Sequence, residues 1–158
     1  MKICQDYAKL NRKLIADTIL EKMGISEVSR FETVHNYIDH DSNIVRKGAI
    51  SAKKNELLLI PISMKDGCIL GRGKGNEDWN CSAPHGSGRL MSRSEAKKKL
   101  NVADFAKEMA GIYTTCVSEE TLDEAPMAYK SVESIVDNIA DTVDIIKILK
   151  PVYNFKAN

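Results

Sequence analysis

Apolar residues recur every three or four positions along residues 7–23, a spacing that predicts an amphipathic helix. Gly24 follows at the position where glycine commonly ends a helix. Residues 131–139 repeat the pattern and predict a second amphipathic helix. Two shorter helices are predicted between them, over residues 96–100 and 102–110.

The remaining apolar positions are grouped in short runs rich in β-branched residues, which are typical of strands. Strands are predicted within residues 28–38 and over residues 43–46, 48–52, 56–61, 68–70, 112–117, 142–149 and 152–156. Residues 53–55, K-K-N, have the composition of a hairpin turn, and residues 71–76 and 121–130 are predicted to be loops. The pattern predicts an α+β fold, a largely antiparallel sheet flanked by helices, with residues 1–158 forming a single domain.

Composition excludes several classes of protein. Hydrophobic residues make up 43% of the chain and charged residues 28%, as in an ordinary globular protein rather than a disordered one. Lys and Arg number 23 against 22 Asp and Glu, so any basic surface has to be local. The four cysteines form no C-x-x-C pair, which argues against a structural zinc site. No apolar run approaches the ~18 residues of a membrane span, so we expect a soluble, cytoplasmic protein.

The strongest candidate for chemistry is the stretch 79–93, which contains one histidine within a glycine-rich segment. Gly86 and Gly88 flank Ser87, an arrangement that lets backbone N–H groups approach a phosphate. A neutral imidazole at His85 can attack phosphorus, which favours phosphoryl or nucleotidyl transfer. The alternative is an ordinary glycine-rich loop followed by a solvated helix face.

Residues 71–76, G-R-G-K-G-N, are a second glycine-rich segment. Two cations between three glycines suggest another anion-binding loop, and a flexible surface turn is the alternative. A dinucleotide-binding loop is excluded, because the spacing is G-x-G-x-G rather than G-x-G-x-x-G and no βαβ unit surrounds it.

Seven blocks of the chain, in order, resemble one family. The histidine block is S-A-P-H-G-S-G-R-L-M-S-R at residues 82–93. The others are T-V-H-N-Y-I at 33–38, R-K-G-A-I-S-A at 46–52, I-P-I-S-M at 60–64, G-K-G-N at 73–76, D-E-A-P-M-A-Y-K at 123–130 and P-V-Y-N-F-K at 151–156. Together they resemble the RtcB family of GTP-dependent RNA ligases. The resemblance covers nearly all of this chain but only the C-terminal part of a family member, and it implies a β-sandwich flanked by helices.

The resemblance implies a reaction and a nucleotide site. His85 matches the histidine that attacks the α-phosphate of GTP, releases pyrophosphate and carries GMP to an RNA 3′-phosphate; a 5′-hydroxyl end then displaces GMP. A 2′,3′-cyclic phosphate is first opened by hydrolysis. The expected nucleotide-binding residues are Ser63, Gly86, Ser87, Gly88, Tyr129 and Lys156. Tyr129 matches the tyrosine that stacks on guanine and Lys156 the lysine that contacts it, whereas Ser63 lies in P-I-S-M rather than the usual P-G-S-M.

Cations near His85 are the expected contacts for RNA phosphates. Arg89, Arg93 and Lys97 recur every four residues and would share one helix face, with Arg46 and Lys47 as secondary candidates. Such contacts position RNA without reading its sequence.

The resemblance implies Mn²⁺ as a cofactor, with His35 of the H-N-Y block as a ligand. Other family ligands come from N-terminal motifs of the D-x-x-C and G-N-H types. This sequence has no G-N-H run, and its one D-x-x-C run, residues 78–81, lies outside the seven blocks. We therefore expect the chain alone to be weak or inactive unless a second chain supplies the missing N-terminal half. The alternative function is a non-catalytic remnant or subunit that binds RNA or guanine nucleotide. A histidine phosphatase is not indicated, because the sequence has no R-H-G run.

Overall fold

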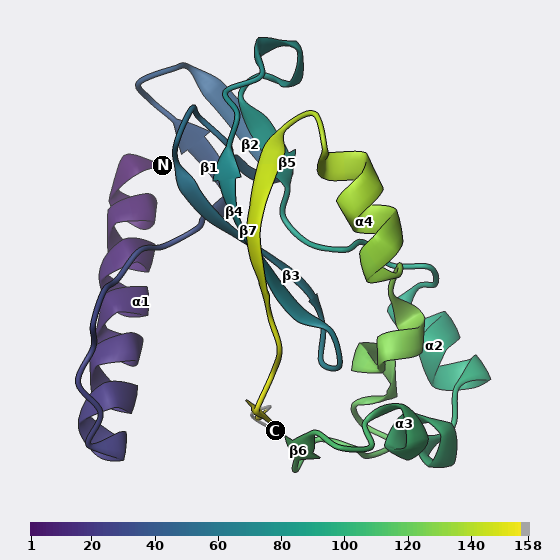
Figure 1. Cartoon of the computed structure of the whole chain (residues 1–158). Coiled ribbons are helices and arrows are strands. Elements are labelled where there is room, and N and C mark those ends of the chain that lie inside the picture. The colour runs from purple at the N-terminus through teal and green to yellow at the C-terminus, as the bar shows by residue number, and fades with distance from the viewer. Residues whose placement is uncertain (156–158) are drawn as a thin grey trace.

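The computed structural model describes residues 1–155, and its first element is the long helix α1 (Lys2–Met23). The helix ends at Gly24, which adopts the left-handed conformation that was expected at this position (φ 63°). It begins five residues earlier than the apolar spacing predicts, where Lys2 and Asp6 form an i, i+4 ion pair. None of its residues is buried. Figure 1 shows α1 at one side of the molecule, with the chain running back along it toward the sheets.

The first sheet is antiparallel, with the order β1-β2-β5. Its strands are β1 (His35–Asp39), β2 (Ile44–Ser51) and β5 (Ser82–Pro84). The two short strands predicted over residues 43–52 are therefore one strand, which continues through Gly48 because glycine tolerates its φ of 66°. The strand predicted within residues 28–38 begins only at His35.

The second sheet is also antiparallel and has the order β3-β4-β7. Its strands are β3 (Leu57–Ser63), β4 (Gly67–Gly73) and β7 (Val143–Leu149). Figure 1 shows β4 and β7 side by side, although some 70 residues separate them in the sequence. The two sheets and helix α4 (Val132–Ile139) share one core. Its buried side chains include Ile50, Leu58, Ile60, Ile62, Ile69, Ile135, Ile139 and Val143.

A second buried cluster lies among α2 (Arg93–Lys99), α3 (Val102–Glu108) and the loop that follows them. Ser92 and Asn101 cap these helices through their side-chain oxygens, and Phe105 is fully buried at the centre of the cluster. The predicted 121–130 loop contains two short 3₁₀ turns, Leu122–Glu124 and Pro126–Ala128. A third turn, Glu77–Trp79, precedes β5.

The strands predicted over residues 112–117 and 152–156 are shorter in the structure. Only β6 (Tyr113–Thr114) and β8 (Tyr153–Asn154) form, and they pair in parallel. The α+β class and the largely antiparallel sheets flanked by helices are confirmed. No helix among residues 1–155 has the length and apolar character needed to cross a membrane.

The predicted loop at residues 71–76 is corrected by the structure. Gly71, Arg72 and Gly73 lie inside β4, where all three pair with β7 and the first two also pair with β3. A Cβ at Gly73 would lie 2.4 Å from the carbonyl carbon of Ala52, so glycine is required by close packing of two backbones. We call residues 71–75 the β4 glycine segment.

Candidate functional site

His85 is the first residue after β5, where the chain leaves the first sheet. Its Nδ1 atom lies 2.6 Å from the backbone oxygen of Gly48 on the neighbouring strand β2. A carbonyl oxygen only accepts, so Nδ1 carries the proton and donates it. In the neutral ring, Nε2 is then the atom with an available lone pair. The side chain is exposed.

The ring of His35 stacks on the ring of His85, with centroids 5.1 Å apart and an angle of 21° between the planes. His35 opens β1, and Asn36 next to it adopts a left-handed backbone conformation (φ 56°) within an irregularity of the β1–β2 ladder. Gly48 donates its N–H to Oδ1 of Asn36 at 2.7 Å. Asn36 thus holds the amide N–H of Gly48, and the carbonyl oxygen of the same residue orients His85.

Asn36 and Gly48 were not singled out as site residues by the sequence. Both lie in blocks that resemble the RtcB family, the H-N-Y and R-K-G-A-I-S-A blocks, and that was the only signal available. The contact of Gly48 with His85, and that of Asn36 with Gly48, depend on the pairing of β1, β2 and β5, which no local sequence pattern predicts.

We call residues 85–88 the histidine loop. Ser87 is almost fully buried and its hydroxyl donates to the backbone oxygen of Ile62 at 2.8 Å. Its amide donates to the oxygen of Pro61, and a Cβ at Gly86 would also lie 3.2 Å from that oxygen. The loop is therefore anchored on β3, with Gly88 exposed at its end. The expected contacts of Gly86, Ser87 and Gly88 with a nucleotide stay predictions.

Ser63, at the end of β3, uses its hydroxyl locally. The hydroxyl donates to Oδ2 of Asp66 at 2.8 Å and accepts from the amides of Lys65 and Asp66, which closes the turn between β3 and β4. A nucleotide contact by Ser63 stays a prediction. Lys156, the other expected guanine contact, lies outside the described residues.

Tyr129 is half-buried and lies beside Arg89, whose guanidinium carbon is 4.8 Å from the ring centroid. The hydroxyl donates to Oε2 of Glu124 at 2.8 Å and accepts from Nη1 of Arg89 at 2.9 Å. Burial, with the Glu124 carboxylate beside it, raises the pKa of Tyr129 to about 12. The phenol is thus neutral and held in one orientation, a suitable state for stacking on a base.

The three cations expected to bind RNA phosphates converge on an acidic pair. Arg93 lies 2.8 Å from Oδ2 of Asp123 and 3.0 Å from Oε1 of Glu124. Lys97 lies 3.7 Å from Oδ1 of Asp123, and Arg89 donates to the Asp123 backbone oxygen. Arg93 and Lys97 share a face of α2 as predicted, whereas Arg89 precedes the helix. The sequence did not suggest these pairings, and contact with RNA stays a prediction.

One secondary expectation is wrong. Arg46 is 2% exposed, and its Nη1 lies 3.0 Å from Oδ2 of Asp39, so this buried side chain is not available to contact RNA. The pKa of Asp39 is held far below its usual range, chiefly by Lys53. In the β4 glycine segment, Arg72 donates to the Asn55 oxygen, and Lys74 donates to the Ala140 oxygen and pairs with Asp144. Anion binding by this segment stays a prediction.

A cleft of about 480 Å³ opens beside His35. One wall is the strand that carries His35, Asn36 and Tyr37, and the other is the N-terminal half of α1, including Cys4 and Ala8. Among residues 1–155, no three His, Cys, Asp or Glu side chains are grouped so that they could hold a metal ion. These residues do not form a manganese site by themselves, and the expected role of His35 as a ligand requires groups from elsewhere.

Comparison with known proteins agrees with this arrangement of blocks. The family model described as tRNA-splicing ligase RtcB matches residues 1–157. The chain belongs to the RtcB family. It is 34% identical over 166 residues to the RNA-splicing ligase RtcB of Escherichia coli (strain K12), a match that covers 94% of this chain and 40% of that protein. It is 32% identical over 174 residues to the tRNA-splicing ligase RtcB of Archaeoglobus fulgidus, with 87% of this chain and 36% of that protein covered.

The chain therefore spans about two fifths of the length of these RtcB relatives. The histidine loop, the stacked His35 and the Arg89–Tyr129 pair all lie in the part that is shared.

Proposed function

We propose that this chain carries the guanylyl-transfer centre of an RtcB-type RNA ligase. The observation that supports it most directly is the orientation of His85, whose Nδ1–H is held by the Gly48 oxygen at 2.6 Å. Nε2 is left as the nucleophile, in a segment that resembles the family's histidine block. The substrates are GTP and RNA with a 3′-phosphate or 2′,3′-cyclic phosphate end and a 5′-hydroxyl end.

In the first step, the Nε2 lone pair of His85 forms a bond to the α-phosphorus of GTP while the bond between that phosphorus and the bridging oxygen breaks. Pyrophosphate leaves with the electron pair. The ring becomes positively charged as the N–P bond forms, and its Nδ1–H bond to Gly48 then strengthens because charged donors form stronger hydrogen bonds. Asn36 keeps the Gly48 peptide in place during this change.

In the second step, an RNA 3′-phosphate oxygen attacks the phosphorus of the histidine–GMP, and the N–P bond breaks to restore neutral His85. A 5′-hydroxyl then attacks the activated RNA phosphate, releases its proton to the solvent and displaces GMP. Tyr129 stacks on guanine, and Arg89, Arg93 and Lys97 lie where RNA phosphates pass. Mn²⁺ would support the reaction only if groups outside residues 1–155 completed its site. The proposed cellular location is the cytoplasm.

The test is acid-labile labelling with α-labelled GTP and Mn²⁺. The chain is incubated alone and with the segment of the E. coli relative that it does not match. We expect little label alone and label on the chain in the mixture, lost in His85→Ala and retained in His40→Ala, which removes an exposed histidine outside the site. No label in the mixture would contradict the proposed activity. Binding of GTP without label would instead assign the non-catalytic binding function.

A further inference from the structure

Arg46 is buried, and no step of the proposed reaction uses it. Its guanidinium forms five hydrogen bonds, one for each N–H that it carries. Two of them reach β1, where the Tyr37 hydroxyl accepts at 3.2 Å and the Asp39 carboxylate at 3.0 Å. We call residues 80–82, which lead into β5, the β5 turn. The other three bonds go to this turn, to the Ser82 hydroxyl at 3.0 Å and to the backbone oxygens of Asn80 at 3.2 Å and Cys81 at 3.4 Å.

The β5 turn has an unusual backbone. Asn80 and Cys81 are consecutive non-glycine residues with positive φ, 50° and 47°. Asparagine tolerates the left-handed region, whereas cysteine rarely adopts it, and such conformations persist only where surrounding contacts hold them. The Cys81 amide donates to the Asn76 oxygen, and the Cys81 oxygen accepts from the Ala52 amide. Arg46 adds a bond to the oxygen of each of the two strained residues.

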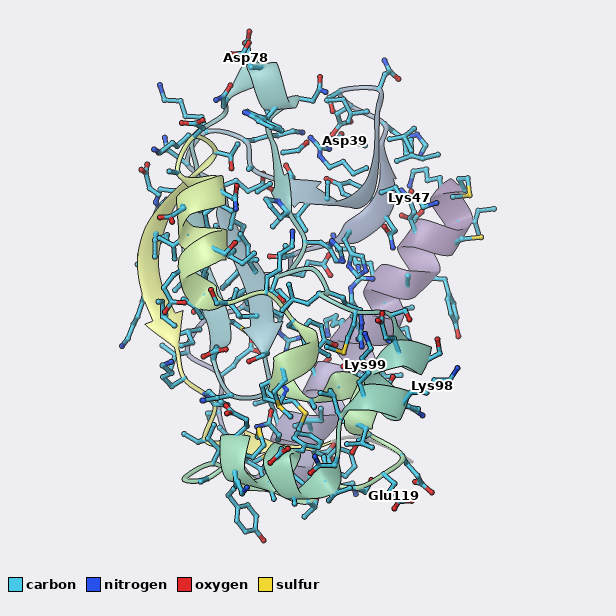
Figure 2. The ribbon with its side chains drawn as sticks, turned by 90° about the vertical axis from the view of Figure 1, so that its right-hand side faces the viewer. Asp39, Lys47, Asp78, Lys98, Lys99 and Glu119 are labelled. Atoms are coloured by element: carbon cyan, nitrogen blue, oxygen red, sulfur yellow. The ribbon has the colours of Figure 1, made fainter. Side chains whose placement is uncertain are left out.

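The ion pair with Asp39 does not by itself account for an arginine at this position. Asp39 also pairs with Lys53, whose Nζ lies 2.9 Å from Oδ2. A lysine carries the same charge as an arginine but lacks the planar fork of donors, and Arg46 uses that fork to reach the β5 turn, 34 to 36 residues along the chain. Figure 2 shows Asp39 at the end of the molecule that also carries Asp78, two residues before this turn. What Arg46 contributes beyond charge is therefore its hold on the β5 turn.

The β5 turn affects the site because β5 is short and is followed directly by His85. Three residues of β5 pair with β2, and the same register brings His85 opposite Gly48, whose oxygen lies 2.6 Å from Nδ1. A shift by one residue would move Ala83 out of the core and turn the His85 side chain toward the other face of the sheet. A strand of three residues has few ladder bonds to resist such a shift, so its register depends on how its ends are held. Ser87 anchors the downstream end on β3, and the β5 turn is the upstream end.

We propose that Arg46 is a positioning residue for His85. Paired with Asp39 in the interior, it holds the β5 turn in its left-handed conformation and so fixes the register that brings Nδ1 of His85 to the Gly48 oxygen. The inference rests on the proposed function in one respect, because it takes His85 to be the nucleophile. The orientation of the ring can be measured without GTP, metal or RNA, so the two ideas can fail separately.

The experiment compares the full chain with Arg46→Lys, which keeps the charge beside Asp39 and loses the fork of donors. Nitrogen NMR without GTP or Mn²⁺, with the His85 signals assigned by His85→Ala, should show His85 protonated on Nδ1 in the parent and a mixture of tautomers in Arg46→Lys. In the mixture with the unmatched segment of the E. coli relative, guanylylation of Arg46→Lys should be slower by about 100-fold, because the nucleophile is misplaced. The KM for GTP should change little, since no contact with GTP is removed.

Two further variants separate positioning from general stability. Phe105→Leu trims a fully buried side chain in the second cluster, away from the β5 turn, and should lower the urea midpoint without changing the His85 tautomer or the rate. Adding Cys81→Gly to Arg46→Lys should restore the Nδ1 tautomer and raise the rate, because glycine adopts the left-handed conformation without the help of Arg46.

Three results would overturn the proposal: a parent-like His85 tautomer in Arg46→Lys, an equal change in Phe105→Leu, or no recovery on adding Cys81→Gly. Circular dichroism checks folding. If Arg46→Lys does not fold, Ser82→Ala, which removes the hydroxyl between Arg46 and the Asn80 oxygen, should shift the tautomer in the same direction, and no shift would equally overturn the proposal.

The proposed function has its own outcomes in the same experiment. A tautomer that depends on Arg46, in a protein that takes no label in the mixture, would leave positioning standing and contradict the proposed activity. Label that is lost in His85→Ala but equally fast in Arg46→Lys would support the activity and contradict the positioning role.

Discussion

The histidine loop and the β4 glycine segment both alternate glycine with polar residues, yet the structure uses them differently. In the β4 glycine segment, Gly73 is buried and the flanking cations bond to carbonyl oxygens of nearby loops. The histidine loop follows β5, and the side chain of its first residue, His85, is exposed to solvent. Alternating glycines therefore indicate a backbone that another group approaches closely. Only the tertiary structure shows whether that group is a neighbouring strand or a ligand.

The largest contrast should appear in labelling of the reconstituted protein with α-labelled GTP. His85→Ala should abolish the label, because it removes the nucleophile. Arg72→Ala should leave it unchanged, since Arg72 is exposed and its guanidinium donates to the backbone oxygen of Asn55. Equal loss in both variants would show that the two segments share one site.

The next largest difference between the two segments should be in the free energy of unfolding of their glycine variants. Gly73→Ala places a Cβ 2.4 to 2.5 Å from backbone atoms of Ala52 and Lys53, and we expect it to lower the free energy of unfolding by about 3 kcal/mol. Gly86→Ala meets the Pro61 oxygen at 3.2 Å and Cγ of Pro61 at an ordinary 3.9 Å, and should cost less than about 1 kcal/mol. Urea denaturation followed by circular dichroism measures both, and similar midpoints would contradict the close-packing explanation.

Orientation of His85 should depend on Asn36. Asn36→Ala removes the oxygen that accepts from the Gly48 amide, so the Gly48 carbonyl is less firmly held and guanylylation should slow by about 10-fold, the equivalent of one hydrogen bond. Asn36→Asp keeps an acceptor and should retain more of the rate.

Nitrogen NMR of His85 in the chain without GTP provides a separate measurement of the same link. The parent should carry its proton on Nδ1, and Asn36→Ala should shift the population toward the Nε2 tautomer. A parent with its proton on Nε2 would contradict the assigned nucleophile.

The smallest effect concerns RNA. Arg93→Ala should weaken RNA binding and reduce the slope of log affinity against log salt by about one, as expected for a single phosphate contact. Its ion pairs with Asp123 and Glu124 compete with that contact and limit the change. Lys98→Ala on the exposed side of α2 is the matched control, and Figure 2 shows Lys98 projecting from this helix. Binding equal to the parent at every salt concentration would remove Arg93 from the RNA surface.

Prediction from sequence was most accurate for α4, for β7 and for the C-terminal end of α1, because each is marked by a local apolar period or by a terminating residue such as Gly24. It was least accurate where a strand continues through glycine, as β2 does at Gly48 and β4 at Gly71. At those positions the local signal favours a turn, and pairing with two neighbouring strands overrides it.

The sequence by itself determined the α+β class, the family and the choice of His85 as the candidate nucleophile, since these follow from local spacing and from blocks of adjacent residues. Only the tertiary structure decided that Gly48 orients His85, that Arg46 is buried against Asp39 and that Asp123 pairs with Arg93. In the first and last of these contacts the partners lie 37 and 30 residues apart. In the second, Arg46 also bonds to Ser82, 36 residues away. Charge and burial at such distances are set by how strands and helices pack, and a linear pattern does not contain that information.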